Sequence, residues 1–166
     1  MSRSILLVCG SRALTERPEA EAWAREILWQ TILALPRVES PHAASVVVVG
    51  DASGPDAWAL DIAGQTACAR WCRYALDGYR YKTDGVPMSW SAMPALPVAK
   101  AWPLVRNAVM VREVAGLARD FGDVVRVIGL VSPWATTHGT EHTLGLARRA
   151  GLPVERWVYD TAGGAS

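Results

Sequence analysis

The sequence of 166 residues lacks the features of several special classes of protein. No apolar run approaches the ~20 residues that a helix needs to cross a bilayer. The residues after Met1 contain no long apolar stretch of the kind found in a signal peptide. Only three cysteines are present, and an odd number does not suit a disulfide framework. We therefore expect a cytoplasmic protein that is not associated with a membrane.

Charge of either sign is not in excess. The chain contains 17 basic and 16 acidic residues, which gives a formal net charge of +1. Proteins that bind nucleic acid through many phosphates need a larger positive field, so nucleic acid is disfavoured as a partner. The length suits one domain, since a chain of this size buries roughly 70% of the surface that its unfolded form exposes. We expect a single domain over residues 1–166.

Two glycine-rich signatures of nucleotide-binding enzymes are also absent. Neither G-x-G-x-x-G nor the P-loop G-x-x-x-x-G-K-[ST] occurs, which argues against a dinucleotide dehydrogenase and a P-loop ATPase. Cys68 and Cys72 are spaced by one helical turn, but no second Cys or His pair follows at zinc-ribbon spacing. We interpret them as small buried residues on a helix. No metal and no cofactor is expected.

Apolar runs and amphipathic segments alternate along the chain. Continuous runs are typical of strands that are covered on both faces, as in a parallel sheet. Such an alternation predicts an α/β fold, a three-layer α/β/α, Rossmann-like open parallel sheet. The expected strands are residues 4–9, 44–50, 124–131 and 154–159, and the expected helices are residues 19–35, 55–73, 104–121 and 140–150.

Residues 74–103 interrupt this alternation. The segment contains four prolines and several aromatic residues, a composition that does not suit a regular helix. We expect a strand around Arg73 to Leu76 and then a long loop. Because long loops in compact domains are usually functional or disordered, the aromatic content favours an ordered flap at about residues 77–103.

Three of the predicted strands are followed by loops of small and polar residues. Ligands of open α/β sheets bind beyond the carboxyl ends of the strands, so these loops are candidates for a binding site. Glycine and serine also follow strands in many proteins as simple turns, and each loop alone is a weak signal. The candidate residues are Gly10, Ser11 and Arg12 in the first loop, Gly50, Asp51, Ser53, Gly54 and Asp56 in the second, and Thr136, Thr137, Gly139 and Thr140 in the third.

A fourth segment, "WPLVRNAVM", places Arg106 and Asn107 in the first turn of a predicted helix that begins near Pro103. The N–H groups of a first turn have no partner within the helix. The positive charge of an arginine at this position opposes the helix dipole, which lowers the stability of the helix unless an anion or a carboxylate offsets the charge. Of the individual residues in the sequence, the position of Arg106 gives the strongest indication of a bound phosphate.

The segment "ATTHGTEHT" supports two interpretations, a zinc site or a phosphate-binding turn. His138 and His142, with Glu141, have the H-x-x-E-H spacing of a family of zinc peptidases. Alternatively, Gly139 and Thr140 form a turn that opens a helix and receives a phosphate. Glu155 is the only glutamate after His142, so a third zinc ligand is hard to find. We favour the phosphate turn, with histidines that face solvent, cap the helix or contact a ligand.

Four segments together resemble the SLOG superfamily, most closely its YspA-like (YpsA-related) branch. They are, in order, "ILLVCGSRALTE", "VVVVGDASGPDAWALDIA", "PLVRNAVM" and "HGTEHTLGLARRAGLPV". In that branch G-S-R follows the first strand, G-x-x-x-G-x-D the second, R-N-x-x-M opens a later helix, and G-T precedes the last one. The resemblance implies a Rossmann-like nucleotide-binding domain and leaves the aromatic middle unexplained. The site residues that it implies are Gly10, Ser11, Arg12, Gly50, Asp51, Gly54, Asp56, Arg106, Asn107, Gly139 and Thr140.

The same superfamily contains the "lonely guy" phosphoribohydrolases, which cleave the N-glycosidic bond of cytokinin nucleotides. Their R-K-x-x-M and P-G-G-x-G-T-x-x-E motifs supply an arginine and a glutamate to the reaction. Arg106 matches the arginine, but Thr143 stands at the glutamate position and cannot stabilise an oxocarbenium-like state. Glu141 is expected on the opposite helix face. Asp51 or Asp56 would have to be recruited, although Asp56 also suits a helix N-cap.

We therefore expect a protein that binds a nucleotide or nucleotide-derived ligand. The alternative is an N-glycosidase or phosphoribohydrolase that acts on a nucleoside monophosphate, with Arg106 and Asp51 as catalytic residues. A DNA-binding role, as in the DNA-processing protein DprA of the same superfamily, is disfavoured by the near-zero net charge. A homodimer would suit the family, but no heptad or apolar stripe in the sequence indicates one.

Overall fold

The structure, a computed structural model, describes residues 3–37, 45–66, 70–77, 80–85 and 102–161. Its centre is one six-stranded sheet with the order β4-β3-β2-β1-β5-β6. Five of the strands are parallel, and β4 pairs antiparallel with β3 at one edge. The strands are β1 (Ser4–Gly10), β2 (Val46–Val49), β3 (Arg70–Asp77), β4 (Arg80–Gly85), β5 (Val124–Val131) and β6 (Val154–Val158).

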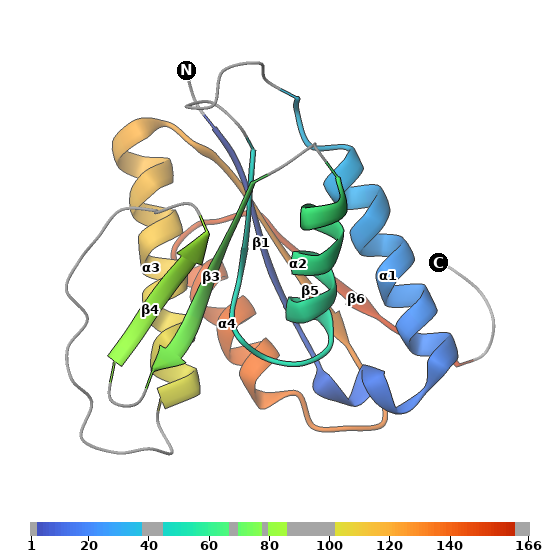
Figure 1. Ribbon diagram of the computed structural model, residues 1–166. Coiled ribbons are helices and arrows are strands. Elements are labelled where there is room, and N and C mark those ends of the chain that lie inside the picture. Colours follow the sequence, from blue (N-terminus) through green and yellow to red (C-terminus); the bar gives the residue numbers. More distant parts are fainter. Residues whose placement is uncertain (1–2, 38–44, 67–69, 78–79, 86–101, 162–166) are drawn as a thin grey trace.

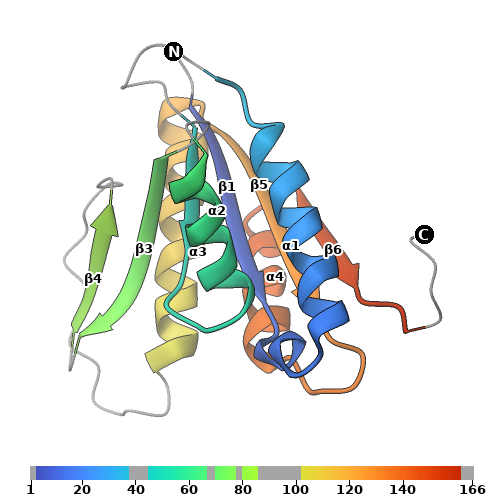
Figure 2. The same cartoon turned by 45° about the vertical axis from the view of Figure 1, so that its right-hand side comes forward.

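Helices cover both faces of the sheet. Figures 1 and 2 show α1 and α2 on one face and α3 and α4 on the other, which confirms the predicted three-layer α/β/α fold. None of the helices in the described ranges has both the length and the apolar character needed to cross a membrane. The helices are the 3-10 helix η1 (Arg12–Glu16), α1 (Pro18–Leu33), α2 (Pro55–Gln65), α3 (Trp102–Phe121) and α4 (His138–Arg149).

The sheet divides the apolar core into two layers. Successive side chains of a strand point to opposite faces, and in β1 Ile5 and Leu7 belong to the layer under α3 and α4. Leu6 and Val8 belong to the layer under α1 and α2. All four of these side chains are buried. This explains why the strands appear in the sequence as continuous apolar runs rather than as alternating patterns.

The expected helix over residues 55–73 was wrong in its second half. Helix α2 ends at Gln65, and β3 begins at Arg70. Cys72 therefore lies in a strand, where it is buried, while Cys68 lies outside the described residues. All four residues of β2 are buried, and β3 supplies the ladder partner that this strand needs on its second side.

Part of the expected loop is also a strand. The structure shows β3 extending to Asp77 and then β4 over Arg80–Gly85, within the segment where we expected a flap. The register pairs Tyr74 with Thr83 and Leu76 with Tyr81. Residues 86–101, which hold the rest of the expected flap, lie outside the described residues.

The order of the strands creates a switch point between β1 and β5. From β1 the chain proceeds to β2 and β3 on one side, and β5 leads to β6 on the other. Ligands of open α/β sheets bind beyond the carboxyl ends of the strands at such a point. In Figure 1 the loop after β1 and the beginnings of α3 and α4 all lie at the lower edge of the sheet. The fold thus brings segments from distant parts of the sequence to one place.

Gly54, the residue before α2, has a backbone conformation that side chains rarely adopt, with φ 82° and ψ −134°. We expect Gly54→Ala to lower the free energy of unfolding by roughly 1–3 kcal/mol, because this region of φ and ψ is strained for any residue with a Cβ. Urea unfolding would measure the change.

The matched control is Gly64→Ala, near the other end of α2. Among the described residues, none lies within 4 Å of the Cβ that this change adds. Replacing a helical glycine by alanine stabilises by up to about 1 kcal/mol, so the two substitutions should have opposite signs. Equal effects at the two positions would contradict the interpretation of Gly54.

Candidate functional site

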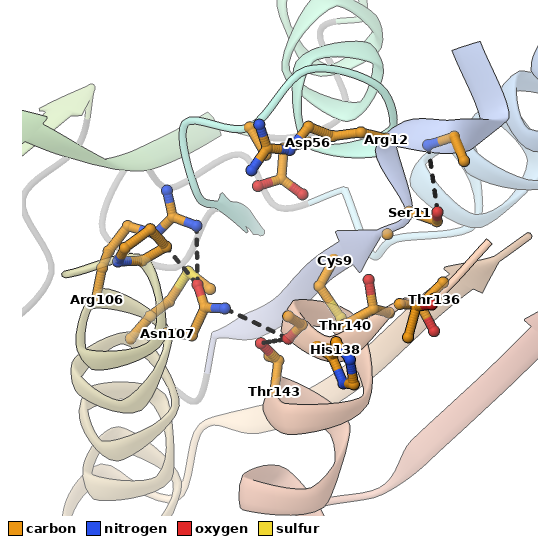
Figure 3. Close-up of a pocket in the computed structure, with 17 residues that line it drawn as sticks. Cys9, Ser11, Arg12, Asp56, Arg106, Asn107, Thr136, His138, Thr140 and Thr143 are labelled. Atoms are coloured by element: carbon orange, nitrogen blue, oxygen red, sulfur yellow. Dashed lines mark hydrogen bonds between the residues drawn. The ribbon is translucent and has the colours of Figure 1, made fainter. Parts of the chain in front are cut away.

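A pocket of about 270 Å³ lies at the switch point. It is formed by the end of β1 with η1, by the start of α2, by the first turns of α3 and by the loop from β5 to α4. Figure 3 shows polar side chains from all four segments around this hollow. The lining residues are Cys9, Gly10, Ser11, Arg12, Ala13, Ala52, Asp56, Pro103, Arg106, Asn107, Met110, Thr136, Thr137, His138, Gly139, Thr140 and Thr143.

The loop after β1 is tied to its neighbours by backbone contacts. The Ser11 N–H donates to the carbonyl oxygen of Leu130 in β5 at 2.8 Å. The Ser11 hydroxyl accepts from the Ala13 N–H at 3.3 Å and so caps η1. A Cβ on Gly10 would lie 2.3 Å from Cγ of Pro55, the first residue of α2. Glycine at this position therefore allows α2 to approach the end of β1.

Arg106 is a buried cation beside the pocket, with 5% of its surface exposed. Its Nη1 forms an ion pair with Asp51 in the loop after β2. Its Nε and Nη2 donate to Oδ1 of Asn107 at 3.1 and 2.9 Å. The Asn107 amide donates in turn to the carbonyl oxygen of Gly139 at 3.4 Å, which links the start of α3 to the start of α4. Figure 3 shows this chain of contacts along one side of the pocket.

Two guanidinium groups affect one another across the pocket. Burial, and then the charge of Arg12, lowers the pKa of Arg106 to about 10. Arg106 stays protonated at neutral pH, but its charge is held at a cost in free energy. The Arg12 side chain is exposed and has no hydrogen bond or ion pair with any part of the chain that the structure describes. A bound anion would therefore relieve repulsion between two cations.

The N-terminus of α4 opens onto the same pocket. The first intrahelical bond joins the Glu141 N–H to the carbonyl oxygen of Thr137 at 2.9 Å, and the Thr137 side chain does not cap the helix. The N–H groups of the first turn have no partner within a helix and attract anions. A Cβ on Gly139 would meet no described atom within 4 Å, so the space beside this turn is open.

Aromatic contacts hold the loop between β5 and α4. The Trp134 ring packs edge to face on Tyr159, with 5.7 Å between ring centroids, and the guanidinium carbon of Arg17 lies 4.0 Å from the centroid of the Trp134 ring. The Trp134 indole N–H also donates to Glu16 at 3.3 Å. Contacts of this kind add about 0.5–1.5 kcal/mol each. They position the threonines that follow in the loop.

Asp56 contributes a carboxyl group to the pocket lining, although the residue as a whole is only 5% exposed. Burial raises its pKa to about 7, and this rise is limited by hydrogen bonds from the backbone N–H groups of Ala52 and Gly50 and by the charge of Arg12. A carboxyl group of this kind exists in both protonation states near neutral pH, which is the range in which general acids and bases work.

Cys9 lines the floor of the pocket but is not suited to nucleophilic chemistry. Burial, followed by the charges of Asp56 and Glu141, raises the pKa of its thiol well above the usual value. Its Sγ lies 3.6 Å from the carbonyl oxygen of Ile128, to which the thiol donates. The thiolate, which is the reactive form, is therefore suppressed.

The structure brings together most of the residues that the sequence indicated. Gly10, Ser11 and Arg12 from the first loop line one pocket with Arg106 and Asn107 from α3. Asp56, Thr136, Thr137, Gly139 and Thr140 line the same pocket. Gly50, Asp51, Ser53 and Gly54 are not among its lining residues. Of these four, Asp51 contacts Arg106, and Gly50 lies against Arg106 and Asp56.

Several other lining residues were not predicted from the sequence. Thr143 and Met110 belong to the motifs of the superfamily resemblance, and His138 belongs to the H-x-x-E-H pattern, so a signal existed for each of the three. Cys9, Ala13, Ala52 and Pro103 gave no chemical signal because they line the pocket mainly through position. Thr143 is fully buried, and its hydroxyl donates to the carbonyl oxygen of Gly139 at 2.9 Å.

The carboxylate of Glu141 lies away from the pocket. It forms an ion pair with Arg156 of β6 at 2.8 Å and is not a lining residue. Glu141 therefore does not replace the acid that Thr143 lacks. Within the described ranges, no group of three His, Cys, Asp or Glu side chains is arranged to hold a metal ion.

The raised pKa of Asp56 predicts a pH-dependent stability. Between about pH 4, where a free aspartate ionises, and about pH 7, the folded state binds more protons than the unfolded chain. The free energy of unfolding should fall over this interval as pH rises. Asp56→Asn removes the titration, so its stability relative to the wild type should rise by on the order of a few kcal/mol between these limits and then stay constant.

Urea unfolding of both proteins at pH 4.5, 6, 7 and 8 would measure this difference. Asp61→Asn is the matched control, since it makes the same substitution at an exposed aspartate on the same helix. A constant offset for Asp56→Asn would show that Asp56 titrates as an ordinary aspartate.

Comparison with known proteins adds no assignment: no family model, no curated protein and no solved structure matches the chain.

Proposed function

We propose that the protein binds a nucleotide or a nucleotide-derived small molecule in this pocket, with the phosphate at the start of α4 between Arg12 and Arg106. The observation on which this rests is the convergence of three anion-attracting groups on one hollow. These are the exposed guanidinium of Arg12, the buried guanidinium of Arg106 and the uncapped N-terminus of α4.

The charges around the pocket support an anion of modest size. Asp51 offsets part of the charge of Arg106, and Asp56 is partly protonated near neutral pH. Arg12 and the first turn of α4 therefore supply the positive potential that remains. A phosphate can accept hydrogen bonds from the N–H groups of the helix and from a guanidinium at the same time. Such charge-assisted hydrogen bonds are shorter and stronger than those between neutral groups.

The resemblance of the four segments to the SLOG superfamily supports the same proposal from the sequence. The G-S-R, the R-N and the G-T of those segments place Ser11, Arg12, Arg106, Asn107, Gly139 and Thr140 around the pocket. The resemblance is the reason to name a nucleotide, since the pocket itself argues only for a phosphate-bearing molecule.

Hydrolysis of the N-glycosidic bond is the second candidate function. One observation favours it, namely the Asp56 carboxyl with a pKa of about 7 at the pocket. Asp56 suits this role better than Asp51, because Asp51 pairs with Arg106. Free adenine released from AMP, and lost in Asp56→Asn but not in Asp61→Asn, would support hydrolysis. Binding of AMP without release of adenine would decide for binding alone.

The substitution Arg12→Ala tests the proposed binding. Because its side chain is exposed and has no partner in the described ranges, the substitution should leave the fold intact. The loss of one charge-assisted hydrogen bond, roughly 1.5–3 kcal/mol, should raise the Kd for AMP and for inorganic phosphate about ten- to hundredfold. Isothermal titration calorimetry would measure both constants.

Arg149→Ala is the control, because Arg149 is an exposed arginine in the last turn of α4, at the end of that helix away from the pocket. It removes the same charge far from the pocket and should leave both constants unchanged. If phosphate, AMP, ADP and ADP-ribose all fail to bind the wild-type protein and to raise its melting temperature, the proposed function is wrong.

A further inference from the structure

The position of Asp56 is unexpected in a pocket that attracts anions. Its carboxyl group lines the same hollow as Arg12 and Arg106, and Figure 3 shows it beside the Arg12 side chain. A Cβ on Gly50 would lie 2.7 Å from Oδ2 of Asp56 and 2.9 Å from Cζ of Arg106. The carboxyl group and the guanidinium therefore both lie close to Gly50, and both residues line the pocket.

These two neighbours do not neutralise each other. Nη1 of Arg106 pairs with Asp51, and its other donors bond to Asn107. The Asp56 carboxyl accepts from the backbone N–H groups of Ala52 and Gly50. Across the described ranges, no side chain forms a hydrogen bond or an ion pair with Asp56. An ionised carboxylate accepts about four hydrogen bonds, so roughly two of its acceptor sites remain for a ligand.

A carboxylate at this place requires a donor from the ligand. The phosphate cannot contact Asp56 without repulsion, so the part of the ligand that faces Asp56 must supply O–H or N–H groups. The pocket holds about 270 Å³, which is less than the ~300–1,000 Å³ typical of sites for whole drug-sized ligands. The group next to the phosphate, and not a distant base, is therefore the part that reaches Asp56. In a nucleotide that group is the pentose.

We propose that Asp56 accepts a hydrogen bond from a sugar hydroxyl of the ligand and makes the pocket selective for a pentose phosphate unit over inorganic phosphate. The inference rests on the proposed function, since it uses the same phosphate position. It adds the class of ligand, a phosphate ester whose sugar retains its ring hydroxyls. Arg12 and the start of α4 bind the phosphate, and Asp56 distinguishes what is attached to it.

The test compares AMP with 2′,3′-dideoxy-AMP and with inorganic phosphate at pH 8. At this pH the Asp56 carboxyl is ionised, because its pKa is about 7. The two nucleotides share base and phosphate and differ only in hydroxyls. The wild-type protein should bind AMP at least about tenfold more tightly than the dideoxy analogue, the factor expected for one hydrogen bond to a charged group. This comparison needs no variant.

Asp56→Asn and Asp56→Ala then assign the selectivity to this side chain. Both should reduce the ratio of the two affinities towards one, and Asp56→Ala more completely, since asparagine retains one acceptor oxygen. Both should leave the affinity for inorganic phosphate unchanged or higher, because a negative charge has been removed. Asp61→Asn, on the outer surface of α2, should preserve the ratio.

The outcomes separate this inference from the proposed function. Equal binding of AMP and its dideoxy analogue by the wild-type protein would overturn the role of Asp56 and leave phosphate binding in place. A loss of inorganic phosphate binding in Asp56→Asn would also overturn it, since Asp56 would then contact the phosphate. Failure of the wild-type protein to bind any of the three ligands would reject both proposals.

Discussion

The burial of one guanidinium group is the constraint around which the pocket is organised. Removing Arg106 from water costs several kcal/mol unless partners replace the lost hydration. Asp51 and Asn107 are these partners, and Asn107 extends the network to the backbone of α4. Three segments that are distant in the sequence, the loop after β2 and the first turns of α3 and α4, are therefore held together by one charge. An ion pair of this kind rarely adds much stability by itself, and its position beside the pocket agrees with the binding role that we propose.

The charges near the pocket differ because their surroundings differ. Arg12 is exposed and remains available to a ligand, whereas Arg106 is committed to Asp51 and Asn107 and supplies mainly its field. Asp51 and Asp56 are only five positions apart, yet the first compensates a cation and the second faces the pocket with a raised pKa. Burial, and not residue type, decides these roles. The same effect keeps the Cys9 thiol protonated on the floor of the pocket.

Much of the fold could be predicted because its strands are buried on both faces. The apolar runs that became β1, β2 and β5 are recognisable without knowledge of their neighbours, and so is the periodic segment that became α1. The prediction failed where local and long-range preferences disagree. Residues 70–73 continue a plausible helical spacing, but β2 needs a partner strand on its second side. That requirement acts between segments that are separated in sequence and has no local signature.

The sequence by itself determined the layered α/β architecture and the edge of the sheet at which polar loops would meet, because hydrophobic periodicity and short turn-forming segments are local properties. It also indicated Arg106 and the turn at Gly139 as parts of a binding site. An arginine in the first turn of a helix opposes the helix dipole, and the N–H groups of a first turn have no partner within the helix. Only the tertiary structure decided which carboxylate faces the pocket. That choice depends on the close approach of Gly10 to Pro55 and on the path of the chain through Gly54, which direct Asp56 inward and leave Asp51 to Arg106. The pKa of Asp56 follows from this packing, because desolvation is a property of the assembled fold and not of the residue.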